Sequence, residues 1–208
     1  MGYAVHEYFA RADYRRRVAE MYLAEPSSGV AGWRAFRQAR DRLFREHPQS
    51  ALEPAERAKL DTLPFFDYAD QYRFTVTIVP VVDDEGLSID TGGEDGVQHY
   101  RRVGRMATPL GHLTVFWLTG YGGGLFLPFR DPTAGTDTYE GGRYLVDTIK
   151  GTFGRGMVVD GDTAVLDLNY AYNPSCAYNA RYACPLAPAE NWLSVPVRAG
   201  EMKYPGPP

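Results

Sequence analysis

A chain of 208 residues is long enough for one domain with a core of its own, and contents of 44% hydrophobic and 23% charged residues are ordinary for a globular protein. The net charge of −4 divides into +2 on residues 1–61 and −6 on the remainder, so neither part has the basic surface that nucleic-acid binding requires. No apolar run approaches the roughly 20 residues that span a membrane. We therefore expect neither nucleic acid nor a membrane as a partner.

The N-terminus bears on the compartment. Its cluster of arginines, residues 15–17, follows the first apolar residues, whereas a secretory signal has the reverse order. We therefore expect a cytoplasmic protein. In that compartment the two cysteines, Cys176 and Cys184, are expected to be thiols rather than a structural disulfide.

Helices are predicted in the N-terminal part of the chain. Apolar residues recur there at three- and four-residue spacing, which indicates helices over residues 5–25, 29–47 and 53–60. The second helix is followed by Pro48, which cannot continue it. The two longer helices carry aromatic stripes, and we expect these to pack on the main domain or on each other.

After residue 61 the pattern changes to the alternation of β-strands. Strands are predicted over residues 72–82, 87–90, 97–107, 112–118, 125–129, 143–148, 163–169 and 193–198. Short strands joined by Gly-rich turns indicate an antiparallel sandwich or barrel, so the fold class is mainly β, and α+β overall with two to three N-terminal helices. The expected organisation is a helical segment (1–61), a β domain (62–203) and a frayed tail (204–208).

The stretch from Leu166 to Leu193 is a strand followed by a long loop rich in Tyr, Asn and Pro. A loop of this length in a compact domain is either functional or disordered, and its aromatic content argues against disorder. Its motifs are Asp167-Leu168-Asn169, Ala171-Tyr172-Asn173-Pro174, Cys176-Ala177, Cys184-Pro185-Leu186 and Glu190-Asn191.

These motifs, with the segment from Gly120 to Leu145 and Ala199-Gly200-Glu201, resemble the DUF1684 family of uncharacterised bacterial proteins. The resemblance covers roughly residues 30–203, and Leu168 stands where the family has Phe. The resemblance implies a fold and the position of a site. It implies no reaction, because the family carries no established activity.

Arg143 lies in a loop dense in hydrogen-bonding groups, close to Tyr139. A planar guanidinium binds carboxylates and phosphates in a bidentate manner, so Arg143 is a candidate anchor for an anionic ligand. The alternative is an ion pair with Asp131, Asp137 or Asp167 that holds the loop against the sheet.

Asp167 and Asn169 alternate with leucines on a predicted strand, so they share a face. If that face is buried, Asp167 is a candidate general base with a raised pKa. The alternative is that both residues brace the loop that follows, because Asp and Asn side chains readily bond to loop backbone.

The sequence identifies no reaction, since P-loop, GxGxxG and GxSxG motifs are absent and the histidines are too scattered for a metal site. Cys176 and Cys184, seven residues apart, match no zinc spacing. We expect a cofactor-independent protein that binds a small organic molecule, anionic if Arg143 is its anchor, in a polar and aromatic pocket. The expected catalytic residues are Asp167, Arg143 and Tyr172, and the expected substrate contacts are Asn169, Tyr139, Asn173 and Cys176.

Acid–base chemistry of isomerase, cyclase, lyase or hydrolase type is the reaction class that these residues favour. In that hypothesis Arg143 holds an anionic group, Asp167 transfers a proton, and Tyr172 and Asn169 orient the substrate. The alternative is a non-catalytic interaction or structural module whose helical N-terminus contacts a partner or forms a homodimer. A redox-sensing role for the two cysteines is a third hypothesis.

Overall fold

A computed structural model describes residues 5–23, 29–82, 85–93 and 96–206. The helices are α1 (Val5–Leu23), α2 (Gly29–Glu46) and α3 (Pro54–Arg57), and the strands are β1 (Arg73–Pro80), β2 (Leu87–Asp90), β3 (Val97–Thr108), β4 (Gly111–Leu118), β5 (Gly124–Phe129), β6 (Arg143–Asp147), β7 (Met157–Asp160) and β8 (Thr163–Asp167). Short 3-10 helices follow β6 (η2, Thr148–Lys150) and β8 (η3, Leu168–Tyr170), and others span η1 (Asp70–Tyr72), η4 (Ser175–Ala177) and η5 (Ala189–Asn191). The predicted helix end at 24–25 and residues 207–208 of the predicted tail lie outside the described residues.

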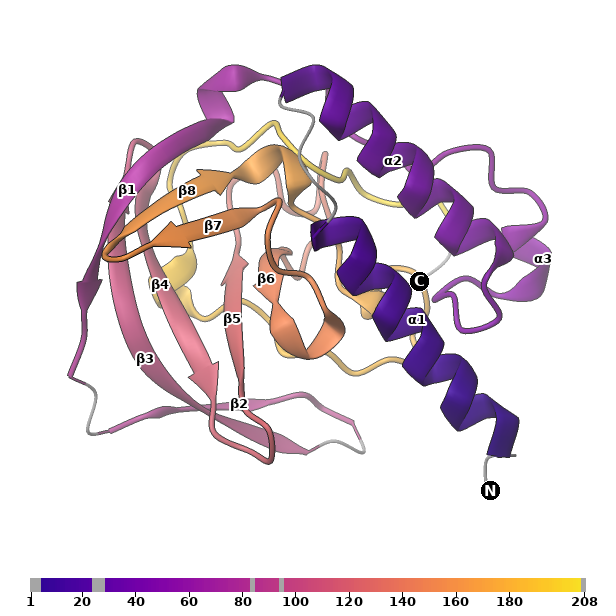
Figure 1. The fold of residues 1–208 in the computed structure, drawn as a ribbon, viewed down its shortest axis with the longest axis horizontal. Coiled ribbons are helices and arrows are strands. Elements are labelled where there is room, and N and C mark those ends of the chain that lie inside the picture. The colour runs from indigo at the N-terminus through magenta and orange to yellow at the C-terminus, as the bar shows by residue number, and fades with distance from the viewer. Residues whose placement is uncertain (1–4, 24–28, 83–84, 94–95, 207–208) are drawn as a thin grey trace.

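The strands form one antiparallel sheet in the order β6-β5-β4-β3-β1-β8-β7, with β2 paired to β3. The sheet curls into a half-barrel (Figure 1), which confirms the predicted fold class. Its core contains the inward-facing residues of the strands, because successive side chains along a strand point to opposite faces of the sheet. The fully buried members include Met106, Leu113, Leu127, Val146 and Leu166.

One predicted strand is wrong and one strand was missed. Residues 193–198 form no strand, because Pro196 has no N–H to donate and the neighbouring backbone bonds to side chains instead. The Val197 N–H donates to Asp131 Oδ1 at 3.0 Å, and the Arg198 N–H donates to the hydroxyl of Tyr72 at 3.1 Å. The missed strand is β7, which pairs with β8 at the sheet edge.

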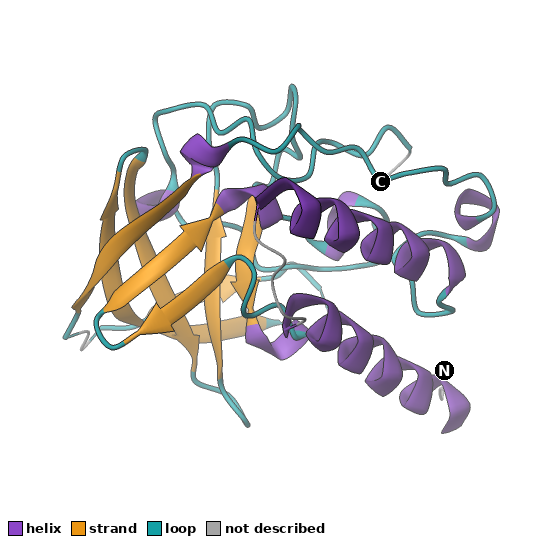
Figure 2. Ribbon diagram, turned by 45° about the horizontal axis from the view of Figure 1, so that its top comes forward, coloured by secondary structure: helices purple, strands orange, loops and turns teal. Residues whose placement is uncertain are grey.

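The helix α2 packs as its pattern predicts, with Trp33, Phe36, Leu43 and Phe44 buried. In α1 the buried residues lie near its C-terminal end, whereas Val5 and Phe9 are each 72% exposed. The expected packing therefore does not extend to the N-terminal half of α1, which projects away from the sheet (Figure 2). In the described part of the chain, no helix combines the length and the apolar character needed to cross a membrane.

Side-chain contacts cross the predicted boundary at residue 61. The indole N–H of Trp33 donates to the carbonyl of Asn169 at 3.2 Å, and Tyr22 packs edge-on against Tyr172 with ring centroids 5.9 Å apart. Near the C-terminus, Tyr204 packs against Tyr178, centroid to centroid 5.5 Å. Helices and sheet therefore share a core, while the proposed division into segments stays a prediction.

Candidate functional site

Arg143, the predicted anion anchor, is 1% exposed at the start of β6. Its guanidinium donates to Asp131 Oδ2 at 2.8 Å and to the carbonyl of Val197 at 2.9 Å, and it also donates to the carbonyl of Ala199. Burial lowers the pKa of Arg143, while the Asp131 carboxylate opposes that shift. Of the three acidic partners considered, the structure selects Asp131, and this ion pair ties the C-terminal segment to the sheet.

Asp167 and Asn169 come together at the end of β8, although Asn169 lies in η3 rather than in the strand. The Asn169 amide donates to Asp167 Oδ1 at 2.8 Å and to the carbonyl of Ala69 at 3.0 Å, and its Oδ1 accepts the Ala69 N–H at 3.0 Å. Burial raises the pKa of Asp167. The pair braces the segment that leads into β1.

Tyr172 is buried, and its hydroxyl shares a hydrogen bond of 2.6 Å with Thr152 Oγ1. Burial raises the pKa of Tyr172 well above its usual value. The Arg40 guanidinium lies over the tyrosine ring, 5.4 Å from its centroid. Tyr172 is therefore enclosed by protein groups and carries a neutral hydroxyl.

Asn173 contacts a buried ion pair that the sequence analysis missed. The Asn173 N–H donates to Glu201 Oε2 at 2.7 Å, and the Arg40 guanidinium donates to the same oxygen at 2.9 Å. Burial opposes the charge of Arg40, but Glu201 raises the pKa of Arg40 well above its usual value. The sequence signal that could have indicated this ion pair is the position of Arg40, a charged residue within the apolar stripe of α2.

These five predicted residues, Arg143, Asp167, Asn169, Tyr172 and Asn173, do not converge on a common opening. In the described part of the chain, none of them lines either of the two pockets described below. Their side chains bond mainly to neighbouring protein atoms, although the Nε of Arg143 and the Oδ1 of Asn173 have no hydrogen-bond partner in the structure. The catalytic and binding roles assigned to them stay predictions, and the geometry offers them no cavity.

The other two predicted residues, Tyr139 and Cys176, do line a pocket, of about 400 Å³. Its walls come from the β2–β3 turn, the β5–β6 loop and the loop of the two cysteines. The residues that line it are Asp90, Thr91, Gly92, Tyr139, Cys176, Tyr182, Ala183, Cys184 and Leu186. We call this the thiol pocket.

Both cysteines in the thiol pocket are free thiols of intermediate exposure. The hydroxyl of Tyr139 donates to Cys176 Sγ at 3.5 Å, and Cys184 is hydrogen-bonded to the same sulfur. The bond from Cys184 lowers the pKa of Cys176 to about 7, with Tyr139 contributing, although burial opposes the shift. The same bond raises the pKa of Cys184, so the pair shares one readily lost proton. Cys176 is thus partly a thiolate at neutral pH.

Neighbouring groups fix the loop that carries the thiols. The hydroxyl of Tyr144 donates to the carbonyl of Pro185, and the indole of Trp192 donates to the carbonyl of Ala187 at 2.9 Å. On the opposite wall Gly93 lies so close to Ala183 that an added Cβ would meet the alanine Cβ at 2.2 Å. Hydrogen bonds to the cysteine loop and the close approach of Gly93 to Ala183 therefore fix the walls of the pocket.

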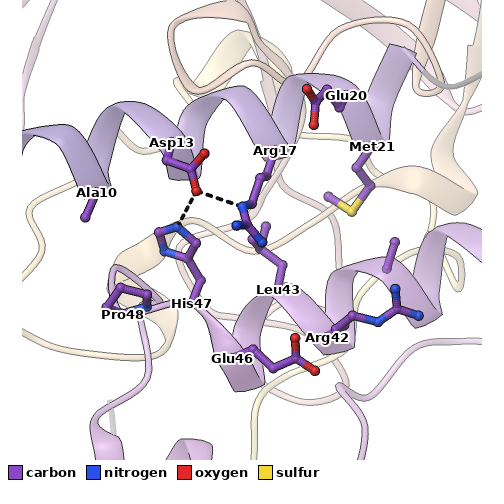
Figure 3. A pocket seen from close by; sticks show the side chains of 11 residues that line it. Ala10, Asp13, Arg17, Glu20, Met21, Arg42, Leu43, Glu46, His47 and Pro48 are labelled. Atoms are coloured by element: carbon purple, nitrogen blue, oxygen red, sulfur yellow. Dashed lines mark hydrogen bonds and ion pairs between the residues drawn. The ribbon is translucent and has the colours of Figure 1, made fainter.

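A larger groove of about 560 Å³ lies between α1 and α2 (Figure 3). Asp13 stands at its centre, where its carboxylate accepts from Arg17 at 2.7 Å and contacts Nε2 of His47 at 3.3 Å. Hydrogen bonds from Arg16 and Arg17 lower the pKa of Asp13 to about 2. The arginine contacts lie within α1, and the contact with His47 joins α1 to the residue that follows α2.

The Asp13–His47 pair has the residue types of a catalytic dyad, but its imidazole is occupied. The backbone N–H of Gln49 donates to Nδ1 of His47 at 3.1 Å, which leaves the proton on Nε2 for Asp13. A general base needs an unoccupied nitrogen within reach of its substrate. We therefore prefer the thiol pocket, whose sulfur nucleophile faces an opening.

The thiol pocket does not have the donor set of a structural zinc site, which requires four N or S ligands. The described residues that line it offer two sulfurs, two phenol oxygens and the carboxylate of Asp90, and no histidine nitrogen. Across the described residues, no three His, Cys, Asp or Glu side chains gather into a group that could hold a metal ion.

Comparison with known proteins places these features in a wider group. A family model described as protein of unknown function, DUF1684, matches residues 58–202, which include the whole cysteine loop. The solution NMR structure of an uncharacterized protein from Haloarcula marismortui is 34% identical, with a TM-score of 0.56, over 83% of this chain and 92% of that one. No curated protein matches the sequence.

Proposed function

This chain belongs to the DUF1684 family, whose function is unknown, and we propose that it binds a small organic molecule in the thiol pocket. The observation that carries the proposal is the position of Cys176, a free thiol at the wall of a pocket that accepts a hydrogen bond from Tyr139 and has Cys184 beside it. Perturbed nucleophiles in concave sites are typical of functional sites. The pocket volume of about 400 Å³ suits a small metabolite rather than a polymer.

The chemistry we propose needs no cofactor and is centred on Cys176. A group whose pKa lies near the working pH is both available as a base and able to give the proton back. The Cys176 pKa of about 7 meets that condition, and the Tyr139 hydroxyl is a donor beside it. Burial and the bond to Cys176 raise the pKa of Tyr139, so its phenol stays protonated and can orient a ligand. The acid–base role expected for Asp167 is thus proposed for Cys176 instead.

The lining residues indicate the class of ligand. Among the described residues that form the walls, Asp90 is charged and none is cationic, while Tyr139, Tyr182 and Leu186 provide apolar surface. A thiolate and a carboxylate both repel anions. We therefore propose a neutral or cationic ligand with an apolar part, in place of the anionic ligand that Arg143 suggested.

Competition with alkylation tests the proposal. A panel of neutral and cationic aromatic compounds is screened for slowing the reaction of Cys176 with iodoacetamide, followed by peptide mass spectrometry. Protecting compounds should bind several-fold more weakly to Tyr139→Phe, while Tyr121→Phe, at a fully exposed tyrosine, should leave binding unchanged. The proposal fails if no compound protects Cys176, or if both variants bind every protecting compound as the wild type does.

A second candidate function has a specific observation in its favour. The N-terminal half of α1 exposes Val5 and Phe9, each 72% accessible, on a helix that projects from the body (Figure 1). Exposed apolar helix faces are typical of association sites. Self-association through α1 is therefore the alternative to a purely ligand-binding role.

A further inference from the structure

We propose that Cys176 and Cys184 form a working dithiol that reduces small disulfides, with Cys176 as the attacking sulfur and Cys184 as the resolving one. The inference rests on the site of the proposed function, because the disulfide would enter the thiol pocket. It goes further in naming a substrate class and a reaction. It makes the two cysteines one functional unit.

The first support is geometric. The two cysteines are separated by seven residues, and the intervening chain folds back so that the two thiol groups come close enough to shift each other's pKa. Both are free and both line the same pocket. A resolving thiol must reach the sulfur that carries the mixed disulfide, and this contact places Cys184 within reach.

The second support is the asymmetry of the pair. Tyr139 donates to the sulfur of Cys176, so a negative charge on that sulfur has two donors. Cys184 is the donor in the pair and keeps its proton. Thiol–disulfide exchange needs this difference in protonation, since the attacking sulfur must be a thiolate while the resolving sulfur is still a thiol.

The first step forms a mixed disulfide. The Cys176 thiolate attacks one sulfur of a small disulfide, RSSR, forming a bond from Cys176 to SR and breaking the bond between the two SR groups. The leaving thiolate, RS⁻, takes the proton of Cys184 and departs as RSH.

The second step closes the protein disulfide. The Cys184 thiolate attacks the sulfur of Cys176, which expels the second RS⁻, and this group takes a proton from water. Counting the proton that Cys176 gives to water when it ionises, the protein dithiol loses two electrons and two protons, and RSSR becomes two molecules of RSH. Excess small thiol reverses both steps and restores the dithiol.

The size of the rate advantage can be estimated from the sulfur chemistry. At pH 7 a thiol with a pKa of about 7 is half ionised, against a few per cent for an ordinary thiol of pKa near 8.5. Lower basicity also lowers nucleophilicity, with a Brønsted slope of about 0.4–0.5. The two effects together leave Cys176 about threefold faster than an ordinary cysteine, before access is considered.

The experiment uses 2-hydroxyethyl disulfide with the reduced full-length protein and two variants, Cys176→Ser and Cys184→Ser, read by intact mass. The wild type should lose the mass of two hydrogen atoms and accumulate little adduct. Cys184→Ser should stop at one stable adduct on residue 176. Cys176→Ser should form its adduct at least about threefold more slowly than the wild type loses its first thiol.

A mass gain of two adducts on the wild type, or a Cys176→Ser variant that reacts as fast as the wild type, would overturn the proposal. If a serine variant fails to fold, judged by circular dichroism, the wild type is quenched early with iodoacetamide and mapped, and the first adduct must lie on Cys176. The two proposals fail separately. Compounds that protect Cys176 while no internal disulfide forms would leave ligand binding standing and remove the dithiol reaction.

Discussion

The guanidinium of Arg40 donates to the carboxylate of Glu201 at 2.9 Å, and the two side chains are 4% and 0% exposed. The pair joins α2 to the C-terminal segment. The carboxylate also accepts the backbone N–H of Asn173, at the beginning of the cysteine loop. One buried charge pair therefore links the helical part, the chain end and the loop of the thiol pocket.

Replacing Glu201 with Gln should destabilise the fold strongly, because Arg40 would be left as a buried charge without its partner. Loss of one member of a buried ion pair costs about 3–5 kcal/mol. Urea unfolding measures the change, with Glu20→Gln as control, since the exposed Arg16–Glu20 pair should contribute about 0–1 kcal/mol. Equal midpoints for the two variants would contradict the role assigned to Glu201.

A second stability test concerns Arg143, and it distinguishes a structural role of this residue from a catalytic one. Arg143→Ala removes the partner of buried Asp131 and the donors to two backbone carbonyls, so we expect a loss of about 3–5 kcal/mol. Arg198→Ala, at an exposed ion pair, should cost about 0–1 kcal/mol. An Arg143→Ala protein that keeps its unfolding midpoint would contradict the structural role and support the catalytic role expected from the sequence.

The fold was largely predictable because it depends on local patterns. Alternation located seven of the eight strands, and helical spacing located the helices, to within a few residues. Residues 193–198 were wrongly predicted as a strand because they have strand-like composition, whereas their backbone bonds to Asp131, Tyr72 and Arg143. Those partners lie more than 50 residues away, and no local pattern reports them. The short edge strand β7 has three exposed residues in four and lacks alternation.

The site was less predictable, because polar residues of the same types serve both loops and ligands. Arg143 and Asp167 have the residue types of a catalytic site, yet the hydrogen bonds that each forms are to protein groups. Tyr139 and Cys176 were named from the same loops, and they do share a pocket. The contact between Cys176 and Cys184 depends on the path of the loop, which a seven-residue spacing does not specify.

Gly93 tests whether the two walls of the thiol pocket are coupled. In Gly93→Ala the new methyl would overlap Ala183, the neighbour of Cys184, so the cysteine loop must shift. We expect the alkylation rate of Cys176 to change several-fold. Gly120→Ala is the matched control, since a Cβ there meets nothing within 4 Å. An unchanged rate in Gly93→Ala would show that the β2–β3 turn does not shape the site.

The exposed face of α1 tests self-association. If Val5 and Phe9 form a dimer contact, Phe9→Ser should lower the average mass measured by sedimentation equilibrium and leave the fold intact, because the side chain is 72% exposed. Deleting the whole helix would be a poorer test, since it would also remove buried Tyr22 from the core. A wild type that is monomeric at high concentration would contradict the association.

The most direct test of the thiol pocket as the functional site is the pH dependence of iodoacetamide labelling, followed separately at the two cysteines. A lowered pKa means that the thiolate is present near neutrality, so the Cys176 rate should rise with pH to a midpoint near 7, while Cys184 stays slow. Cys184→Ala removes the largest cause of the shift, and the midpoint should move upward. Equal labelling of both cysteines with a midpoint near 8.5, the value of an ordinary thiol, would contradict the account.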